Sequence, residues 1–227
     1  MRSGCSVRAL VRIACVASLA LMAHAARGEP RVVEPAPKAN TDTSYGRLDG
    51  DLAVVLGAGL SIGPRAPRAA LDLRLRYLDT IGIFFQYEDA PLIGASSDPR
   101  RVFATGVELR PLFIGRWLTG RESSTGRLDL AVDSIGLELG ASFAQPTGAS
   151  FPARPGVQAG IGIELPVLAS ATGPWIGIHG GVRWSDAAMS GEPLAGPSDR
   201  ALFLSVTLAW HQLFLAHAVD AGDRAPR

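Results

Sequence analysis

Apolar and non-apolar positions alternate with a period of two along most of this chain. The alternation is clearest in residues 68–77, where the two sets are Leu71, Leu73, Leu75 and Tyr77, and Asp72, Arg74 and Arg76. Because successive side chains of a strand point to opposite faces, each such segment forms a strand with one apolar face. The sequence therefore predicts about eight strands, at residues 51–63, 68–78, 81–88, 101–114, 128–143, 157–167, 175–184 and 201–211.

The fourth and fifth strands contain interruptions. Pro111 cannot donate to a ladder, so it marks a strand end or a bulge. In the fifth strand the apolar positions change parity between Val132 and Ile135. A bulge near Asp133, a kinked strand or a short helical turn before Ile135 would each restore one apolar face.

The connections alternate in length as they do in up-and-down membrane barrels, where odd connections are long and external and even ones short and periplasmic. Connections three, five and seven are long, at 89–100, 144–156 and 185–200, and connections two and six are short, at 79–80 and 169–173. The first connection is shorter than this rule expects, and the fourth, 115–127, is longer.

The non-apolar face separates two kinds of barrel. A soluble lipocalin-like barrel turns its apolar face inward, whereas a transmembrane barrel turns it towards lipid. Glycine weakens a strand face that meets water, and the only lysine of the chain, Lys38, lies outside the strands. The glycines on this face are Gly57, Gly59, Gly82, Gly106, Gly136, Gly140, Gly160, Gly162, Gly177 and Gly181. A crowded lumen explains them best, so we predict an all-β, antiparallel up-and-down β-barrel of the transmembrane type. A soluble periplasmic barrel that binds an apolar ligand is the alternative.

The first part of the chain has the features of an export signal. Arg2, Arg8 and Arg12 precede an apolar stretch at 13–22, which is too short to span a bilayer and is followed by the small-x-small pattern at 23–25. We predict a signal peptide at 1–25, a flexible leader at 26–50, the barrel at 51–214 and a C-terminal tail at 215–227.

Composition excludes several classes of function. Both cysteines, Cys5 and Cys15, fall within the signal, so the mature chain has no disulfide, thiolate metal site or cysteine nucleophile. Without the three arginines of the signal, the chain has 19 basic and 21 acidic residues, a net charge near −2. No basic cluster marks a nucleic-acid surface. We expect no cofactor and no metal.

Aromatic residues gather towards the predicted strand ends, as in the interfacial girdles of membrane barrels. They are Tyr77, Tyr87, Phe103, Phe113, Trp117, Trp184 and Trp210. The whole pattern resembles the small eight-stranded outer-membrane proteins of Gram-negative bacteria. That resemblance implies an exported, monomeric protein in outer-membrane lipid, inserted by the barrel-assembly machinery, with a structural, adhesive or minor channel role. Such barrels end in an aromatic strand residue, whereas this chain continues past Phe214 to Arg227.

Charged side chains share the lumenal parity of these strands. They are Asp72, Arg74, Arg76, Glu88, Glu108, Arg110, Glu138, Glu164, His179 and Arg183, joined by Asp133 if strand five extends through it. Buried charges must be paired, so we predict a salt-bridged network that closes the lumen. A narrow ion path is the functional alternative.

One segment bears on enzymatic activity. Residues 183–186 (Arg-Trp-Ser-Asp) resemble the His-x-Ser-Asn segment of outer-membrane lipid A deacylases, in which the histidine takes the proton of the attacking serine. Here Arg183 occupies the histidine position and cannot act as a base at neutral pH. We therefore expect no enzyme activity, and lipid A esterase chemistry remains a remote alternative.

Overall fold

The computed structural model describes residues 45–47, 49–63, 66–91, 99–121, 123, 125–190 and 199–216. The chain divides into two compact units, Met1–Thr41 and Asp42–Arg227, and the described residues all belong to the second. The predicted signal peptide, most of the predicted leader and most of the predicted tail lie outside the described residues.

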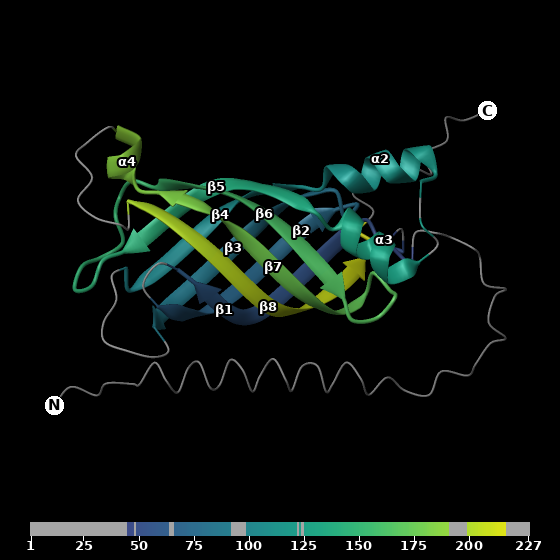
Figure 1. Cartoon of the computed structure of the whole chain (residues 1–227), viewed down its shortest axis with the longest axis horizontal. Helices are drawn as coiled ribbons and strands as arrows, with labels where there is room; N and C mark the ends of the chain where they lie inside the picture. The colour runs from purple at the N-terminus through teal and green to yellow at the C-terminus, as the bar shows by residue number, and fades with distance from the viewer. Residues whose placement is uncertain are drawn as a thin grey trace. The chain divides into compact units, whose positions relative to one another are not determined.

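Eight antiparallel strands form one closed barrel, each paired with its neighbours in sequence order, with β8 pairing back to β1 (Figure 1). The strands are β1 Leu52–Ile62, β2 Pro67–Tyr77, β3 Ile81–Pro91, β4 Arg101–Leu109, β5 Gly136–Gln145, β6 Gly156–Pro166, β7 Gly173–Trp184 and β8 Arg200–Phe214. The predicted up-and-down barrel is thus confirmed.

The two faces of the strands differ as the membrane-type prediction requires. Lumenal positions hold buried charged, polar and small residues, and outward positions hold exposed Leu, Ile and Val on every strand. The soluble alternative is wrong in its central feature, because it needs the apolar face to line the interior. No helix in the described part of the chain is long and apolar enough to cross a bilayer.

The glycines predicted for the lumenal face lie there, and close packing explains them. Gly106 pairs with Gly140 across β4 and β5. A Cβ atom on Gly106 would lie 2.2 Å from the Leu139 carbonyl oxygen, and one on Gly162 would lie 2.2 Å from Nδ1 of His179. Larger residues at these positions would displace backbone or a lumenal side chain.

Two segments predicted as strand are helical. Strand four ends at Leu109, and α2 covers Pro111–Thr119, with Pro111 in the first turn, where its missing N–H costs no helical hydrogen bond. The predicted start of strand five is α3, Gly126–Asp133, so the helical alternative before Ile135 is the correct one. The long fourth connection is long because it contains these two helices.

The two ends of the barrel differ. α2 and α3 lie at the end where the even connections and the barrel's first and last strand ends meet, and the short α4, Asp186–Ser190, lies at the opposite end (Figure 1). We call these the helical end and the α4 end. Beside α3, Leu130, Ala171 and Trp175 form a small apolar cluster with Tyr45 and Leu213 packed against it.

Aromatic residues lie on outward positions near both ends. Those towards the α4 end are Tyr87, Phe103, Phe143 and Trp184, and those towards the helical end are Tyr77 and Trp210. Phe113, predicted in the same girdle, is instead a buried residue of α2. The side chain of Trp117 lies outside the described residues.

Candidate functional site

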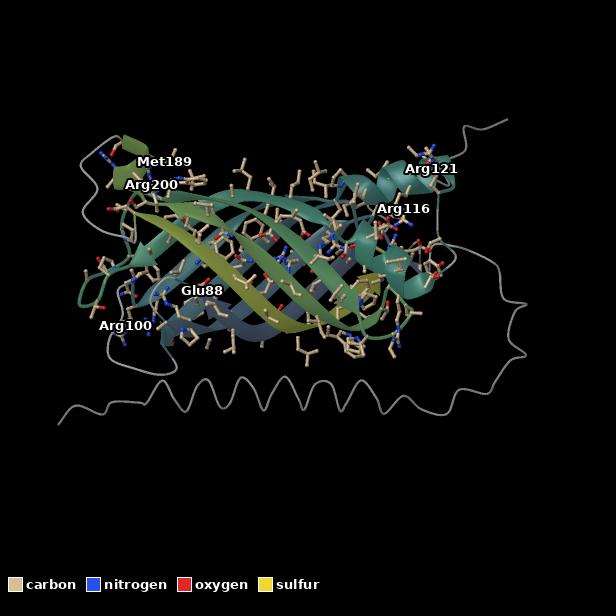
Figure 2. The ribbon with its side chains drawn as sticks, viewed as in Figure 1. Glu88, Arg100, Arg116, Arg121, Met189 and Arg200 are labelled. Atoms are coloured by element: carbon tan, nitrogen blue, oxygen red, sulfur yellow. The ribbon has the colours of Figure 1, made fainter. Side chains whose placement is uncertain are left out.

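The lumen contains all ten charged residues that strand parity placed there. Each is buried, with 0–9% of its surface exposed. Figure 2 shows nitrogen and oxygen atoms gathered inside the barrel and carbon-rich side chains projecting from its outer wall. Eight of the ten form one deep network, and Glu88 and Arg183 form a second cluster nearer the α4 end.

Arg74 is the centre of the deep network. Its Nε donates to Asp72 Oδ2 at 2.7 Å, and its Nη1 donates to Glu108 Oε2 at 3.0 Å and to Glu138 Oε1 at 2.6 Å. The guanidinium also lies 5.7 Å from the ring centre of Phe84, a fully buried lumenal residue. One arginine therefore joins carboxylates from β2, β4 and β5.

Arg76 and Arg110 extend the network across the lumen. Arg76 donates to Glu108 Oε2 at 3.0 Å and to Glu164 Oε1 at 2.6 Å. Arg110 donates to Glu108 at 3.1 Å, to Asp79 at 2.9 Å and also to Glu164. Glu108 and Glu164 thus each bind more than one guanidinium, which offsets the cost of removing these carboxylates from water.

Two histidines complete the deep network. His179 Nδ1 lies 2.7 Å from Glu138 Oε1, and His211 Nε2 lies 3.3 Å from Glu164 Oε2. The His211 ring stacks on Trp175 with 4.4 Å between ring centres. His211 was missing from the predicted network although its parity on β8 is lumenal, and the same is true of Arg68 on β2.

A pair of amides separates the deep network from the cluster nearer the α4 end. Gln158 Nε2 donates to Gln86 Oε1 at 2.9 Å, and Gln158 Oε1 accepts from Arg183 Nε at 2.7 Å. Arg183 Nη2 lies 2.8 Å from Glu88, which also accepts from Ser61 Oγ at 2.7 Å. Figure 2 shows Glu88 towards the end opposite Arg116.

A third charged cluster covers the helical end of the barrel. Arg47, only 2% exposed, binds Asp133 Oδ2 at 2.5 Å through Nη1 and lies 4.7 Å from the ring centre of Phe113. Arg116 of α2 binds both Asp129 and Asp133 of α3. Asp133 therefore belongs to this helical cap and not to a strand.

The sequence pattern gave no sign of this cap. Its residues come from the end of the predicted leader, from the predicted fourth connection and from segments predicted as strand. Tyr45 Oη donates to Asp129 Oδ2 at 3.0 Å. Burial raises the pKa of Asp129, but hydrogen bonds from the Ser123 N–H, Arg116 and Tyr45 outweigh it and hold that pKa below its ordinary value.

Ser185, the serine of the deacylase-like segment, makes contacts that stabilise the start of α4. Ser185 Oγ donates to Asp199 Oδ1 at 2.6 Å and accepts from the Ala188 N–H at 3.2 Å, which caps the start of α4. Arg183 points into the lumen towards Glu88, and His179 lies deeper, bound to Glu138. Within the described part of the chain, the contacts of Ser185 include no histidine. The same part contains no group of three or more His, Cys, Asp or Glu side chains suited to a metal ion.

Comparisons with known proteins add little. No family model matches the chain, and no curated protein matches it. Among solved structures, it is similar to the one described as the solution NMR structure of de novo designed TMB2.3. That match has 14% identity and a TM-score of 0.35, and it covers 71% of this chain and 93% of the other.

Proposed function

We propose that this protein is an integral outer-membrane β-barrel with a closed lumen and a structural or adhesive role, without enzymatic activity. The observation that carries the proposal is the apolar outer wall. Large apolar side chains are at least one-third exposed on all eight strands. They are Leu56, Leu60, Ile62, Leu71, Ile81, Ile83, Val107, Leu109, Leu137, Leu139, Ile161, Leu165, Ile176, Leu202, Leu204, Val206, Leu208 and Phe214.

A wall of this kind is unfavourable in water. Monomeric soluble proteins rarely expose a contiguous apolar patch of more than a few hundred Å². Here the apolar positions run around the whole barrel, while more than fifteen polar and charged residues of the described chain are buried inside it. Lipid around the barrel removes the apolar wall from water, and the antiparallel closure leaves no strand edge unpaired in the membrane.

The lumenal network favours a closed lumen and not an open channel. An eight-stranded barrel has an interior just wide enough for side chains to fill. Arg74, Arg76, Glu108 and Glu164 are 0–2% exposed and bind one another across it. An ion could pass the deep network only after several of these contacts were broken.

The barrel-assembly machinery is the partner proposed for insertion. β8 ends at the aromatic residue Phe214, which is 48% exposed, although the chain continues beyond this strand end to Arg227. Replacing Phe214 with Ala should lower the amount of folded barrel in the membrane, whereas the same change at Phe151, an exposed connection residue, should not. Equal levels of the two variants would remove this part of the proposal.

Membrane extraction tests the location. Membranes from a Gram-negative host expressing the full chain are washed with urea or carbonate, and the pellet is run on a gel with and without boiling. The proposed barrel stays in the pellet, fractionates with the outer membrane and migrates differently when unboiled. Release into the wash, or fractionation with the inner membrane, would contradict it.

A further inference from the structure

A cavity of about 260 Å³ lies at the α4 end of the barrel, and neither the lumenal network nor the outer wall accounts for it. Its inner end is formed by Arg68, Glu88 and Arg183, which are 4–9% exposed. Its sides are mainly apolar, and include Val102, Ala144, Trp184 and Phe203. Ligand pockets combine these features: apolar walls with a few converging polar groups.

Arg183 is fixed in position at the inner end. Its guanidinium carbon lies 4.0 Å from the ring centre of Phe203, and its Nε donates to Gln158. A guanidinium held by an aromatic face and an amide loses little freedom when it binds an anion.

Arg183 retains hydrogen-bonding capacity that these contacts do not use. Its Nε donates to Gln158 and its Nη2 pairs with Glu88 Oε1 at 2.8 Å, and within the described part of the chain these are its polar contacts. A guanidinium has five N–H donors in a planar fork that matches a carboxylate. A ligand oxygen in the cavity would accept these remaining donors.

We propose that this cavity binds a small amphipathic carboxylate, with its anionic head at Arg183 and its apolar chain against Val102, Ala144 and Phe203. At the inner end Arg68 and Arg183 face the single carboxylate of Glu88, so the positive charge that favours an anionic head is local to this end. The rest of the lining adds Arg154, Asp186 and Asp199. The volume lies just below the range of about 300–1,000 Å³ typical for drug-sized molecules, which limits the ligand to a short single chain. The inference goes beyond the proposed function and does not rest on it, because Arg68, Glu88 and Arg183 are buried inside the barrel whatever surrounds the outer wall, although Trp184 and Leu202 extend the cavity to the barrel rim.

Octanoate is the probe, and the indole N–H signals of the tryptophans are the readout. The full chain is labelled with ¹⁵N-tryptophan and refolded in detergent micelles, and unboiled gel mobility verifies folding. The Trp184→Phe variant assigns the signal at the cavity. Octanoate should shift the Trp184 signal saturably and leave that of Trp175, at the other end of the lumen, unchanged. Octylammonium and octanol should bind at least tenfold more weakly, since both lack the carboxylate.

Two variants and one control complete the test. Arg183→Gln should weaken octanoate binding at least tenfold, because the charged hydrogen bonds are lost. Ala144→Phe should abolish binding by filling the cavity without altering any charge, and it keeps the test decisive if Arg183→Gln does not fold. Arg200→Gln, an exposed change at the same end, should bind as the unaltered chain does. An unsaturable shift, equal shifts with octanoate and octanol, or unchanged binding by Ala144→Phe would overturn the proposal.

Discussion

Arginine substitutions along the outer face of β1 distinguish a lipid-facing wall from a water-facing one. Leu56, Leu60 and Ile62 point outward on this strand and are 50%, 45% and 51% exposed. Because their exposures are nearly equal, replacement by Arg removes a similar apolar surface at each position. In water the three variants should therefore differ little in stability. In lipid they should differ by depth.

The depth of each position follows from the strand geometry. β1 spans eleven residues, so Gly57 is its middle residue. With a rise of about 3.4 Å per residue and a tilt of about 40°, Leu56 lies about 3 Å, Leu60 about 8 Å and Ile62 about 13 Å from the midplane. The apolar band of such barrels is about 25 Å tall, so Ile62 lies at its edge. Arginine should cost about 2–4 kcal/mol at Leu56, an intermediate amount at Leu60 and about 0–1 kcal/mol at Ile62.

The assay is equilibrium unfolding of the refolded barrel in lipid vesicles by denaturant, followed by tryptophan fluorescence and unboiled gel mobility. Alanine at the same three positions is the matched control, because it removes the apolar side chain without adding a charge. The difference between the Arg and Ala variants isolates the cost of the charge. A flat series within about 0.5 kcal/mol, as expected for exposed positions in water, or a maximum at Ile62 would refute the lipid-facing assignment.

Three further predictions concern the interior and the helical end. Arg74→Met should lower the free energy of unfolding by about 3–5 kcal/mol, because buried Asp72 loses its hydrogen-bond donor and Glu108 and Glu138 each lose one cationic partner. Adding Glu138→Gln should recover part of that loss in the same assay, and a cost of Arg74→Met below about 1 kcal/mol would contradict the pairing. The protein should produce no stable conductance in planar bilayers, and regular single-channel steps would favour an ion path over a closed lumen. The pKa of Asp129 is lower in the folded protein than in the unfolded chain, where it is about 3.9. The ionised carboxylate therefore stabilises the cap fully above the unfolded pKa, and this stabilisation is lost as the pH falls through the lower folded pKa. Hydrogen-exchange protection of α3, corrected for the intrinsic rate at each pH, should therefore fall in acid. Asp129→Asn should lower this protection already at pH 6 and abolish the pH difference. Unchanged protection in that variant would show that the carboxylate does not hold the cap.

Strand parity was enough to predict which side chains enter the lumen. It was not enough to predict which of them meet, because contacts depend on register and on the tilt of each strand. Arg74 and Glu138, 64 residues apart in sequence, bind at 2.6 Å although their strands β2 and β5 are not neighbours. Arg68 and His211 have lumenal parity as well, but they lie near strand ends, where the sequence does not show whether pairing continues.

The helical end could not be predicted from the same pattern. Leu128, Leu130 and Val132 alternate with smaller or charged residues as in a strand. In α3, however, the buried residues are Asp129, Leu130 and Asp133, which share a helical face. The carboxylates of that face meet Tyr45 and Arg47 from a distant segment, at a separation of more than eighty residues. A local period carries no information about such a contact, so tertiary packing decided the structure of this segment.

The same alternation that predicted the barrel also explains why its charges lie inside. A slip of one residue in the pairing of a strand turns every side chain on it to the other face. For β2, that slip would move Asp72, Arg74 and Arg76 from the lumen into the proposed lipid and bring Leu71, Leu73 and Leu75 among carboxylates. Asp72 is the middle residue of β2, so Arg74 lies about 5 Å and Arg76 about 10 Å from the midplane. With about 2–4 kcal/mol for an arginine at the midplane, less towards the interface and less for an aspartate, the penalty is several kcal/mol, a large part of the stability of a typical domain, about 5–15 kcal/mol. An apolar lumen would impose no such penalty, since leucine is tolerated on both faces. The charged lumen therefore selects one register of β2 more strongly than hydrophobic packing alone could.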